Sequence, residues 1–236
     1  MKVKPVLFLV LLLPFFSNAQ NRVSWEGGLF TGVANYSGDV NPTDSPRFQD
    51  TRPAVGLVGR IPLNTMFNLR SSMIYGRLIG DDRNYPERDF RRFDFKTNLF
   101  EVNMVVEIEP FARDRFYTDA QGNLNLDPLI SPYIFGGVGF GFAALNTDYS
   151  GYSGANKTYL SRIAQDRNAG SSKTLFVAPV GLGIKFDVSR QFALSVEAGV
   201  RVTFSDYLDG ISASGDPEQD DIYYFSGLSC FYRFWQ

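Results

Sequence analysis

The chain has no histidine and a single cysteine among its 236 residues. Without histidine it lacks the general base of Ser-His-Asp and Cys-His nucleophilic sites and the imidazole of the usual zinc centres. A glycine-rich run at 136–139 has the composition of a phosphate loop, but it lies inside a predicted strand with no helix after it, so it predicts no cofactor site. We therefore expect a protein that is not an enzyme, with no cofactor, no metal and no small-molecule substrate.

An excess of one charge and long apolar runs are also missing. The formal net charge is −2 and the basic residues are scattered along the chain, so nothing favours nucleic-acid binding. Beyond the N-terminus, no apolar stretch approaches the ~20 residues that a transmembrane helix needs. The sequence thus predicts no transmembrane helix.

The N-terminus has the features of an export signal. Two lysines precede an apolar run, Val6–Phe16, and the small residues 17–19 come directly before Gln20. The run is too short to span a bilayer, and its flanking residues are typical of a signal-peptidase substrate. We expect a cleaved signal peptide over residues 1–19 and one β-domain over residues 20–236; the alternative is a buried N-terminal helix.

Apolar and polar residues alternate with a period of two along most of the chain. From Phe192 to Phe204 the even positions are apolar, while the odd positions include Ser195, Glu197 and Arg201. A helix would spread those charges around its circumference, whereas a strand places them on one side. The pattern recurs about eight times, at the length of a tilted membrane strand. The predicted strands cover residues 23–36, 52–61, 67–79, 99–109, 133–145, 177–186, 192–204 and 222–235.

The predicted fold is all-β: an eight-stranded antiparallel up-and-down transmembrane β-barrel. Two connections, 62–66 and 187–191, are short, and the links after the first, third, fifth and seventh strands are long and polar. Because such barrels keep short turns in the periplasm and long loops outside, we expect a location in outer-membrane lipid with both termini in the periplasm. The aromatic end of the chain, Tyr232–Gln236, also resembles the signal that delivers bacterial barrels to their assembly machinery.

The polar faces of the predicted strands carry charges of both signs in near balance. A closed lumen suits such a set, since buried charges must pair to offset their lost hydration, although the solvated face of a secreted sandwich could show the same mixture. Because side chains just fill an eight-stranded barrel, we expect no nutrient pore. The predicted lumen charges are Glu26, Arg60, Arg70, Glu101, Glu107, Lys185, Glu197, Arg201 and Arg233.

The predicted outer loops are rich in carboxylates. Converging carboxylates can hold Ca²⁺, but no loop has the spacing of an EF-hand, and Asp also serves turn geometry. We favour a solvated acidic rim over a cation site. The carboxylates are Asp39, Asp44 and Asp50 in the first loop, Asp81 and Asp82 in the second, and Asp206, Asp209, Asp216, Glu218, Asp220 and Asp221 in the fourth.

Two motifs close the first and seventh predicted strands: Tyr36-Ser37-Gly38-Asp39-Val40-Asn41-Pro42, and Ser205-Asp206-Tyr207-Leu208-Asp209. Together they resemble the signatures of the PorG-like family of Bacteroidetes outer-membrane proteins. Gly210 departs from that pattern, as does the loop 146–173. The motif residues that carry the resemblance are Tyr36, Gly38, Asp39, Asn41, Pro42, Asp206, Tyr207, Leu208 and Asp209.

The resemblance implies a part in the type IX secretion system, which exports proteins across the outer membrane and, in gliding relatives, supports motility. It implies contact with periplasmic ring proteins of the PorK and PorN kind. The motifs themselves allow two roles. They could lock the barrel where its first and last strands meet, since turn-forming residues need no partner, or they could bind a partner.

One connection is unusually long for the periplasmic side. Residues 110–131 are rich in apolar side chains, and exposed apolar patches tend to mark interaction sites. We expect a partner contact there; the alternative is a loop that folds back to close the barrel. The candidate contact residues are Phe111, Phe116, Tyr117, Leu124 and Leu126.

The predicted function is therefore an accessory or structural barrel of a type IX secretion or gliding complex that docks periplasmic ring proteins. The alternative is a stand-alone surface barrel that binds an external ligand or cation through its acidic loops.

Overall fold

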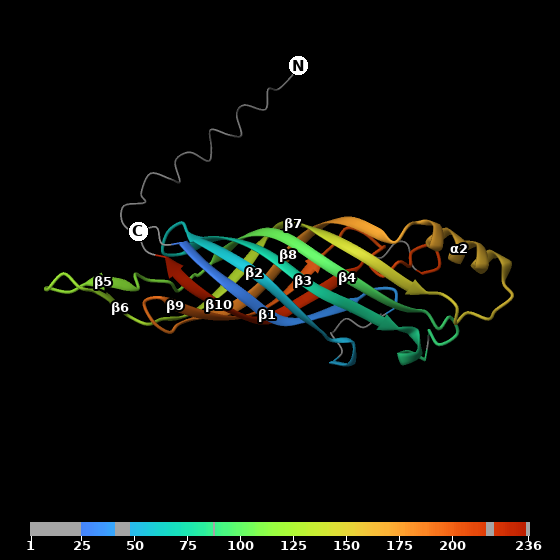
Figure 1. Ribbon diagram of the computed structural model, residues 1–236, viewed down its shortest axis with the longest axis horizontal. Helices are drawn as coiled ribbons and strands as arrows, with labels where there is room; N and C mark the ends of the chain where they lie inside the picture. Colours follow the sequence, from blue (N-terminus) through green and yellow to red (C-terminus); the bar gives the residue numbers. More distant parts are fainter. Residues whose placement is uncertain (1–24, 41–47, 87, 216–219, 235–236) are drawn as a thin grey trace, which may run out of the picture.

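The computed structural model describes residues 25–40, 48–86, 88–215 and 220–234 (Figure 1). The predicted signal peptide lies outside the described residues. Within them, no helix is long and apolar enough to cross a membrane.

Eight antiparallel strands close into a barrel in the order β1-β10-β9-β8-β7-β4-β3-β2, which confirms the predicted fold. Each strand pairs with its neighbour in the sequence, and β1 pairs with β10 from Trp25↔Phe234 to Ser37↔Ile222 to close the ring. The barrel strands are β1 (Trp25–Ser37), β2 (Arg52–Pro62), β3 (Phe67–Asp81), β4 (Asp94–Ile108), β7 (Ile130–Asp148), β8 (Ser172–Asp187), β9 (Phe192–Val202) and β10 (Ile222–Phe234).

Several strands are longer than the alternation predicts. β4, β7 and β8 begin three to five residues before their predicted starts. At the start of β4 and at the end of β7, which runs three residues past its predicted end, the outward side chains are polar, as at Lys96 and Asn146. The inward Phe95 and Leu145 are apolar, so the polar and apolar faces are exchanged there while the backbone pairing continues. β9, in contrast, ends two residues before Phe204, whose φ of 51° is incompatible with a strand.

The barrel has two unlike ends, visible in Figure 1. The terminal end holds the start of β1, the end of β10, the short turns 63–66 and 188–191, and a hairpin of β5 (Phe116–Thr118) and β6 (Leu124–Leu126). The loop end holds the long connections, which contain helix α2 (Lys157–Asn168) and the 3₁₀ turns η2 (Phe48–Asp50) and η3 (Asp82–Asn84). Neither α2 nor the hairpin has a period-two apolar pattern, and neither was predicted.

The outer wall is apolar. Leu29 is 63% exposed and Val196 is 46% exposed, although both lie in the middle of strands, where a water-soluble protein would cover them. Aromatic pairs lie toward both ends: Trp25 stacks on Phe234 with ring centroids 3.9 Å apart, and Phe100 stacks on Phe142 at 6.4 Å. An apolar band between aromatic girdles is the surface that a membrane barrel presents to lipid.

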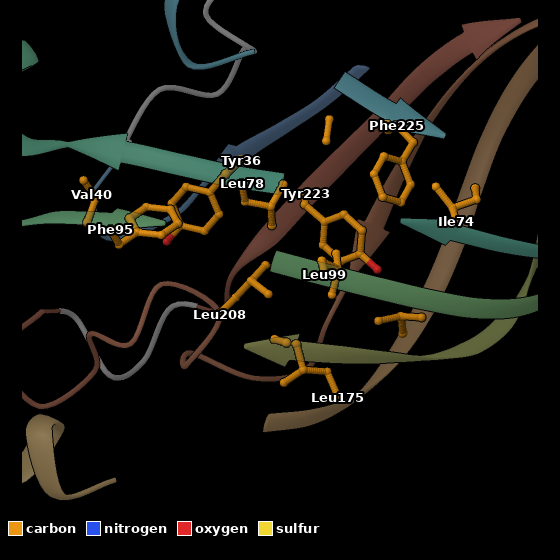
Figure 2. Packing of buried hydrophobic residues seen from close by; sticks show 14 of the residues in the cluster. Tyr36, Val40, Ile74, Leu78, Phe95, Leu99, Leu175, Leu208, Tyr223 and Phe225 are labelled. Carbon is orange, nitrogen blue, oxygen red and sulfur yellow. The ribbon is translucent and has the colours of Figure 1, made fainter. Parts of the chain in front are cut away.

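The interior is filled in two layers. Toward the loop end, apolar side chains from β1, β3, β4, β8 and β10 gather around Leu208, which comes from the β9–β10 connection (Figure 2). Toward the terminal end, the inward side chains are mostly charged. An interior filled by side chains is what an eight-stranded barrel is expected to have.

Candidate functional site

The two sequence motifs meet at the loop end. The Tyr36 hydroxyl lies 2.8 Å from Asp209 Oδ2 and 2.5 Å from Asp221 Oδ1, and all three side chains are buried. We call these three residues the latch. A phenol has one proton to donate, so contact with both carboxyl groups requires that one of them also carries a proton. Burial raises the pKa of Asp209 well above its ordinary value, and the Asp221 charge raises it further; burial also raises the pKa of Asp221, to about 7.

The latch holds the β9–β10 loop inside the barrel mouth. Asp221 Oδ2 accepts a hydrogen bond from the Leu208 amide at 2.8 Å, and Asp209 Oδ1 accepts one from the Ile211 amide at 2.7 Å. Thr97 Oγ1, on β4, donates to the Leu208 carbonyl at 2.8 Å. Backbone groups of the loop thus form hydrogen bonds with Asp221, Asp209 and Thr97. The side chains of Leu208 and Ile211 are completely buried.

Gly38 is the residue that allows the latch to close. A Cβ added there would lie 2.1 Å from both Tyr36 Oη and Asp221 Oδ1, so a larger side chain would displace the hydroxyl or the carboxyl group. The next motif residue, Asp39, packs its carboxylate against Gly215 so closely that a Cβ on Gly215 would overlap it. Gly38 therefore makes room for the carboxyl group of Asp221, and Gly215 makes room for that of Asp39.

A buried arginine ties the β3–β4 connection to the same layer. Arg91 binds both oxygens of Asp82, at 2.8 and 2.9 Å, and donates to the Asp39 carbonyl at 2.6 Å. Arg88 donates to that carbonyl at 2.8 Å. Burial raises the pKa of Asp82 in spite of the bidentate contact with Arg91.

Helix α2 holds the loop from its other side. Asn156 caps the helix through hydrogen bonds to the amides of the first turn, 3.0 and 3.3 Å long. Near its C-terminus, Asp166 accepts hydrogen bonds from the amides of Ala213 and Ser214, both at 2.9 Å. Tyr159 donates to the Ser214 carbonyl at 3.0 Å. The loops of this end therefore form one packed layer.

The remaining motif residues differ in their surroundings. Asp206 is buried, and neither of its carboxylate oxygens has a hydrogen-bond partner within 3.5 Å among the described residues. Burial raises the pKa of Asp206 to about 8; the Ser212 hydroxyl lowers it, and the Asp39 charge raises it. Tyr207 is half-buried, with Lys173 Nζ 4.7 Å from its ring centroid. Asn41 and Pro42 lie outside the described residues.

The acidic loops are mostly engaged in internal contacts. Asp50 lies 3.5 Å from the Tyr85 hydroxyl, and Asp81 binds the exposed Arg83 at 2.8 Å. Asp220 is exposed. No three acidic, cysteine or histidine side chains among the described residues are arranged to hold a metal ion. Asp44, Asp216 and Glu218 lie outside the described part of the chain.

All nine predicted lumen charges point into the barrel and are buried. Arg60 donates to Glu26 at 2.9 Å and to Glu107 at 3.0 Å. Arg70 continues the chain, 3.2 Å from Glu107 and in hydrogen-bonding contact with Glu197. These contacts link five strands from β1 to β9 across the lumen.

The network extends to the terminal end through three residues that the sequence analysis missed: Glu109, Arg115 and Asp187. Glu109 binds Lys185 and Arg115, and Asp187 binds Arg233 and also Arg115, at 3.3 Å. Burial alone would raise the pKa of Glu109, but Lys185 and Arg115 lower it to about 2. The parity of the strands predicts two of the missed residues, since Glu109 and Asp187 continue the inward positions 101–107 and 185.

Nearer the loop end, Arg201 and Glu101 complete the predicted set. Arg201 Nε lies 3.6 Å from Glu101 Oε2, and Tyr223 donates a hydrogen bond to the same carboxylate. With the three added residues, six cations face six anions inside the barrel. These paired side chains occupy the lumen, as expected for a barrel of eight strands.

The β4–β7 connection forms a projecting hairpin, which we call the arm (residues 110–129). Figure 1 shows it extending away from the barrel at the terminal end. Its tip is ordered by Asp119, which accepts hydrogen bonds from the amides of Gln121 and Asn123 at 3.0 and 2.8 Å. Gly122 supplies the φ of 83° that the turn needs.

The candidate contact residues are divided between the arm's surface and its base. Phe111 is 74% exposed and Tyr117 is 55% exposed, whereas Leu126 is half-buried. Phe116 lies at the base, with Arg233 Cζ 5.3 Å from its ring centroid. The side chain of Leu124 lies outside what the structure describes. The arm therefore meets the barrel at its base alone and leaves its two most exposed aromatic rings in solvent.

A family model described as a domain of unknown function, DUF6089, matches residues 4–236. This chain belongs to the DUF6089 family. No curated protein matches its sequence. Similar solved structures include neisserial surface protein A, at 11% identity and a TM-score of 0.49, over 91% of this chain and 100% of that one. The N-terminal β-barrel domain of Pseudomonas aeruginosa OprF has 10% identity and a TM-score of 0.46, over 91% and 100%. Ail, the attachment invasion locus protein of Yersinia pestis, has 12% identity and a TM-score of 0.43, over 91% and 99%.

In this DUF6089 chain, the structure adds partners to the motifs that the sequence could not supply. Arg91, Asp82 and Asp166 hold the motif segments from loops of other strand pairs. No spacing in the sequence indicates these contacts. Asp221 directly precedes β10, and the sequence identified it only as one of the carboxylates of the fourth loop.

Proposed function

We propose that this chain is a non-enzymatic barrel of the outer membrane that acts as an accessory or structural component of a type IX secretion or gliding complex. In this proposal the arm docks periplasmic ring proteins of the PorK and PorN kind. The secretion system is suggested by the two PorG-like motifs. The docking role is supported by the shape and the exposed surface of the arm.

The arm is the single observation that carries the proposal. Phe111 and Tyr117 belong to the arm, which begins after the end of β4 at Ile108, and both side chains are exposed. Exposed aromatic side chains of this kind are typical of interaction sites. Because β5 pairs with β6 and Asp119 orders the tip, a partner meets a preformed hairpin and little conformational entropy is lost on binding.

The proposed orientation has the terminal end in the periplasm. Two of the three connections at that end, 63–66 and 188–191, are tight turns, and the arm is the third; the other long connections lie at the opposite end. Small outer-membrane barrels place their short turns in the periplasm. This orientation puts the arm on the side where ring proteins assemble.

The filled lumen supports a structural role over conduction. Arg60 and Arg70 both contact Glu107 in the lumen toward the terminal end. At the other end, the latch holds Leu208 inside the mouth. A barrel closed in both halves is suited to anchoring a complex in the membrane.

The experiment is a double substitution in the full-length protein, Phe111→Ser with Tyr117→Ser. Neither side chain packs into the barrel, so the variant should stay folded and heat-modifiable on gels. We expect recovery of the ring proteins from detergent-solubilised membranes to fall tenfold or more, in line with the loss of two aromatic anchors. The matched control is Leu160→Ser, an exposed apolar residue of α2 at the opposite end, which should leave recovery unchanged.

A second variant tests the hairpin as a whole. A Gly-Ser linker should replace residues 117–125 and spare Arg115 and Phe116, because those two contact Glu109 and Arg233 of the barrel. Unchanged recovery of the ring proteins with either arm variant would refute docking through the arm.

A further inference from the structure

The outer wall of the barrel carries two cations on its described strands, and they are neighbours. Arg77 of β3 and Lys96 of β4 both point outward and are exposed, whereas the other strand cations follow the inward parity. Arg77 lies opposite Asn98 in the β3–β4 register, and Lys96 lies opposite Ile79. Diagonal cross-strand neighbours of this kind are about 7–8 Å apart, within reach of two long side chains that bind one anion.

Both cations are available for a ligand. Arg77 Nε donates to Asn98 Oδ1 at 2.9 Å, which orients the guanidinium group along the wall. Neither Arg77 nor Lys96 forms an ion pair within the described part of the chain. The nearby Arg83, in contrast, is already paired with Asp81 at 2.8 Å and with Asp94 at 3.5 Å.

The pair lies at the border of the lipid-facing band. Two residues from Arg77 toward the barrel centre, Tyr75 is 46% exposed, and its hydroxyl lies 3.3 Å from Asn98 Oδ1. Phe100 and Phe142, also outward, stack beside it on β4 and β7. Aromatic rings of this kind mark the level of the lipid headgroups, so the two cations are at phosphate depth.

The opposite border of the band differs. Outward residues at the terminal end include Trp25, Phe67, Phe192 and Phe234, and no cation points outward on the described strands there. A general need for solubility would place charges at both borders. At the terminal end the exposed cation Arg190 lies in the 188–191 turn and not on a strand. Two strand cations at one border, above aromatic rings, are complementary to an anionic lipid in one leaflet.

We propose that Arg77 and Lys96, oriented by Asn98, bind the phosphate of a lipid headgroup in the leaflet at the loop end. Arginine matches phosphate with parallel N–H donors, and lysine adds a point charge. The acyl chains lie against Tyr75 and Phe100 directly below. These apolar contacts are the reason to assign the phosphate to a lipid and not to a free ion. The site is independent of docking by the arm.

The test uses the full-length protein in detergent micelles, titrated with bis-phosphorylated lipid A and followed by native mass spectrometry. We expect one preferred lipid per barrel and weaker binding of the dephosphorylated lipid A. With Arg77→Gln and Lys96→Gln combined, binding should weaken by roughly tenfold or more. Each basic residue near an anionic lipid contributes about a fewfold in affinity, and the two contributions multiply. Because both side chains are exposed, the variant should retain its heat-modifiable fold; if it does not, each single substitution is measured separately, with a threefold or larger loss expected.

Arg83→Gln is the matched control, an exposed cation of the same end that is already paired, and it should bind the lipid as the wild type does. Three results would overturn the proposal: equal binding of phosphorylated and dephosphorylated lipid, unchanged binding in the double variant, or an equal loss in the control. Competition by millimolar inorganic phosphate as effective as that by the lipid would assign the cations to free anions and would also reject the lipid site.

Discussion

The latch makes a specific prediction for Tyr36→Phe. The substitution keeps the ring, which packs edge-on against Phe95 with centroids 4.8 Å apart, and removes the hydroxyl between the two buried carboxyl groups. A hydrogen bond to a charged group contributes roughly 1.5–3 kcal/mol, so two independent bonds would give about 3–6 kcal/mol. Here the hydroxyl has one proton, and the second contact uses a proton held by a carboxyl group. That proton stays on its carboxyl group when the hydroxyl is removed, so the two contacts are not lost independently and we expect a loss of about 2–3 kcal/mol.

The loss should appear as opening of the β9–β10 loop, with the strands intact. Amide hydrogen exchange in micelles, read by mass spectrometry, measures this directly at Leu208 and Ile211, whose amides are bonded to the two carboxyl groups. At 1.4 kcal/mol per tenfold, protection of these amides should fall roughly 30- to 150-fold. Tyr133→Phe is the control: its buried hydroxyl donates to Glu197 at 2.9 Å, deep in the lumen, and its removal should leave the loop protected. Wild-type protection at Leu208 in the Tyr36 variant would refute the latch, and equal loss throughout the strands would show that the hydroxyl stabilises the barrel as a whole.

The remaining predictions concern pH, lipid and conduction. Because the pKa values of Asp209 and Asp221 are higher in the folded than in the unfolded chain, their stabilising contribution is full below about pH 4 and is lost as pH rises through about 7. Protection of the loop amides should therefore be greater at pH 5 than at pH 8.5, and Asp221→Asn should reduce that dependence; a rise in protection with pH would contradict the argument. Val196→Arg should weaken insertion into vesicles by roughly 2–4 kcal/mol if it lies near the midplane, whereas equal folding yields would mean that this face avoids lipid. The purified protein should pass no steady current in planar bilayers, and large stable steps are incompatible with the filled lumen.

The strands could be predicted from the sequence because one face of each strand lies against lipid and the other faces the lumen. Val196 meets lipid while Glu197, the next residue, meets the lumen, and this contrast repeats along every strand in the membrane. The prediction stops where the contrast stops. At the loop end the outward Lys96 and Asn146 lie beyond the apolar band, while the inward Phe95 and Leu145 are apolar, so the pattern of the membrane part of β4 and β7 is reversed there and no longer continues.

Some of the ion pairs in the lumen can be predicted from the pairing of neighbouring strands. Glu26 lies directly opposite Arg60 on β2 and directly opposite Arg233 on β10, so strand register alone brings the three together. The pairing of Arg70 with Glu197 joins β3 to β9 across the barrel instead. Such a contact depends on the diameter of the closed barrel, so a local sequence pattern cannot predict it.

The latch is still less accessible to sequence reasoning. Tyr36 and Asp209 are 173 residues apart, and they meet because the ring closes and the loop turns inward. The motifs suggested a role at the closure seam or a partner site, and the contacts of Tyr36 and Gly38 support the seam. Neither residue is exposed to a partner in this arrangement.

Arg233 connects the seam of the barrel to the arm. From the last strand it binds Glu26 on the first, Asp187 at the β8–β9 turn, and the face of Phe116 at the base of the arm. A force on the arm therefore reaches the residue that helps to hold the ends of the barrel together. The dense pairing around Arg233 resists such a force, because separating any one of these buried charges leaves another without a partner. If the arm docks a protein as proposed, an anchor of this kind is suited to transmit load from that protein to a barrel held in lipid.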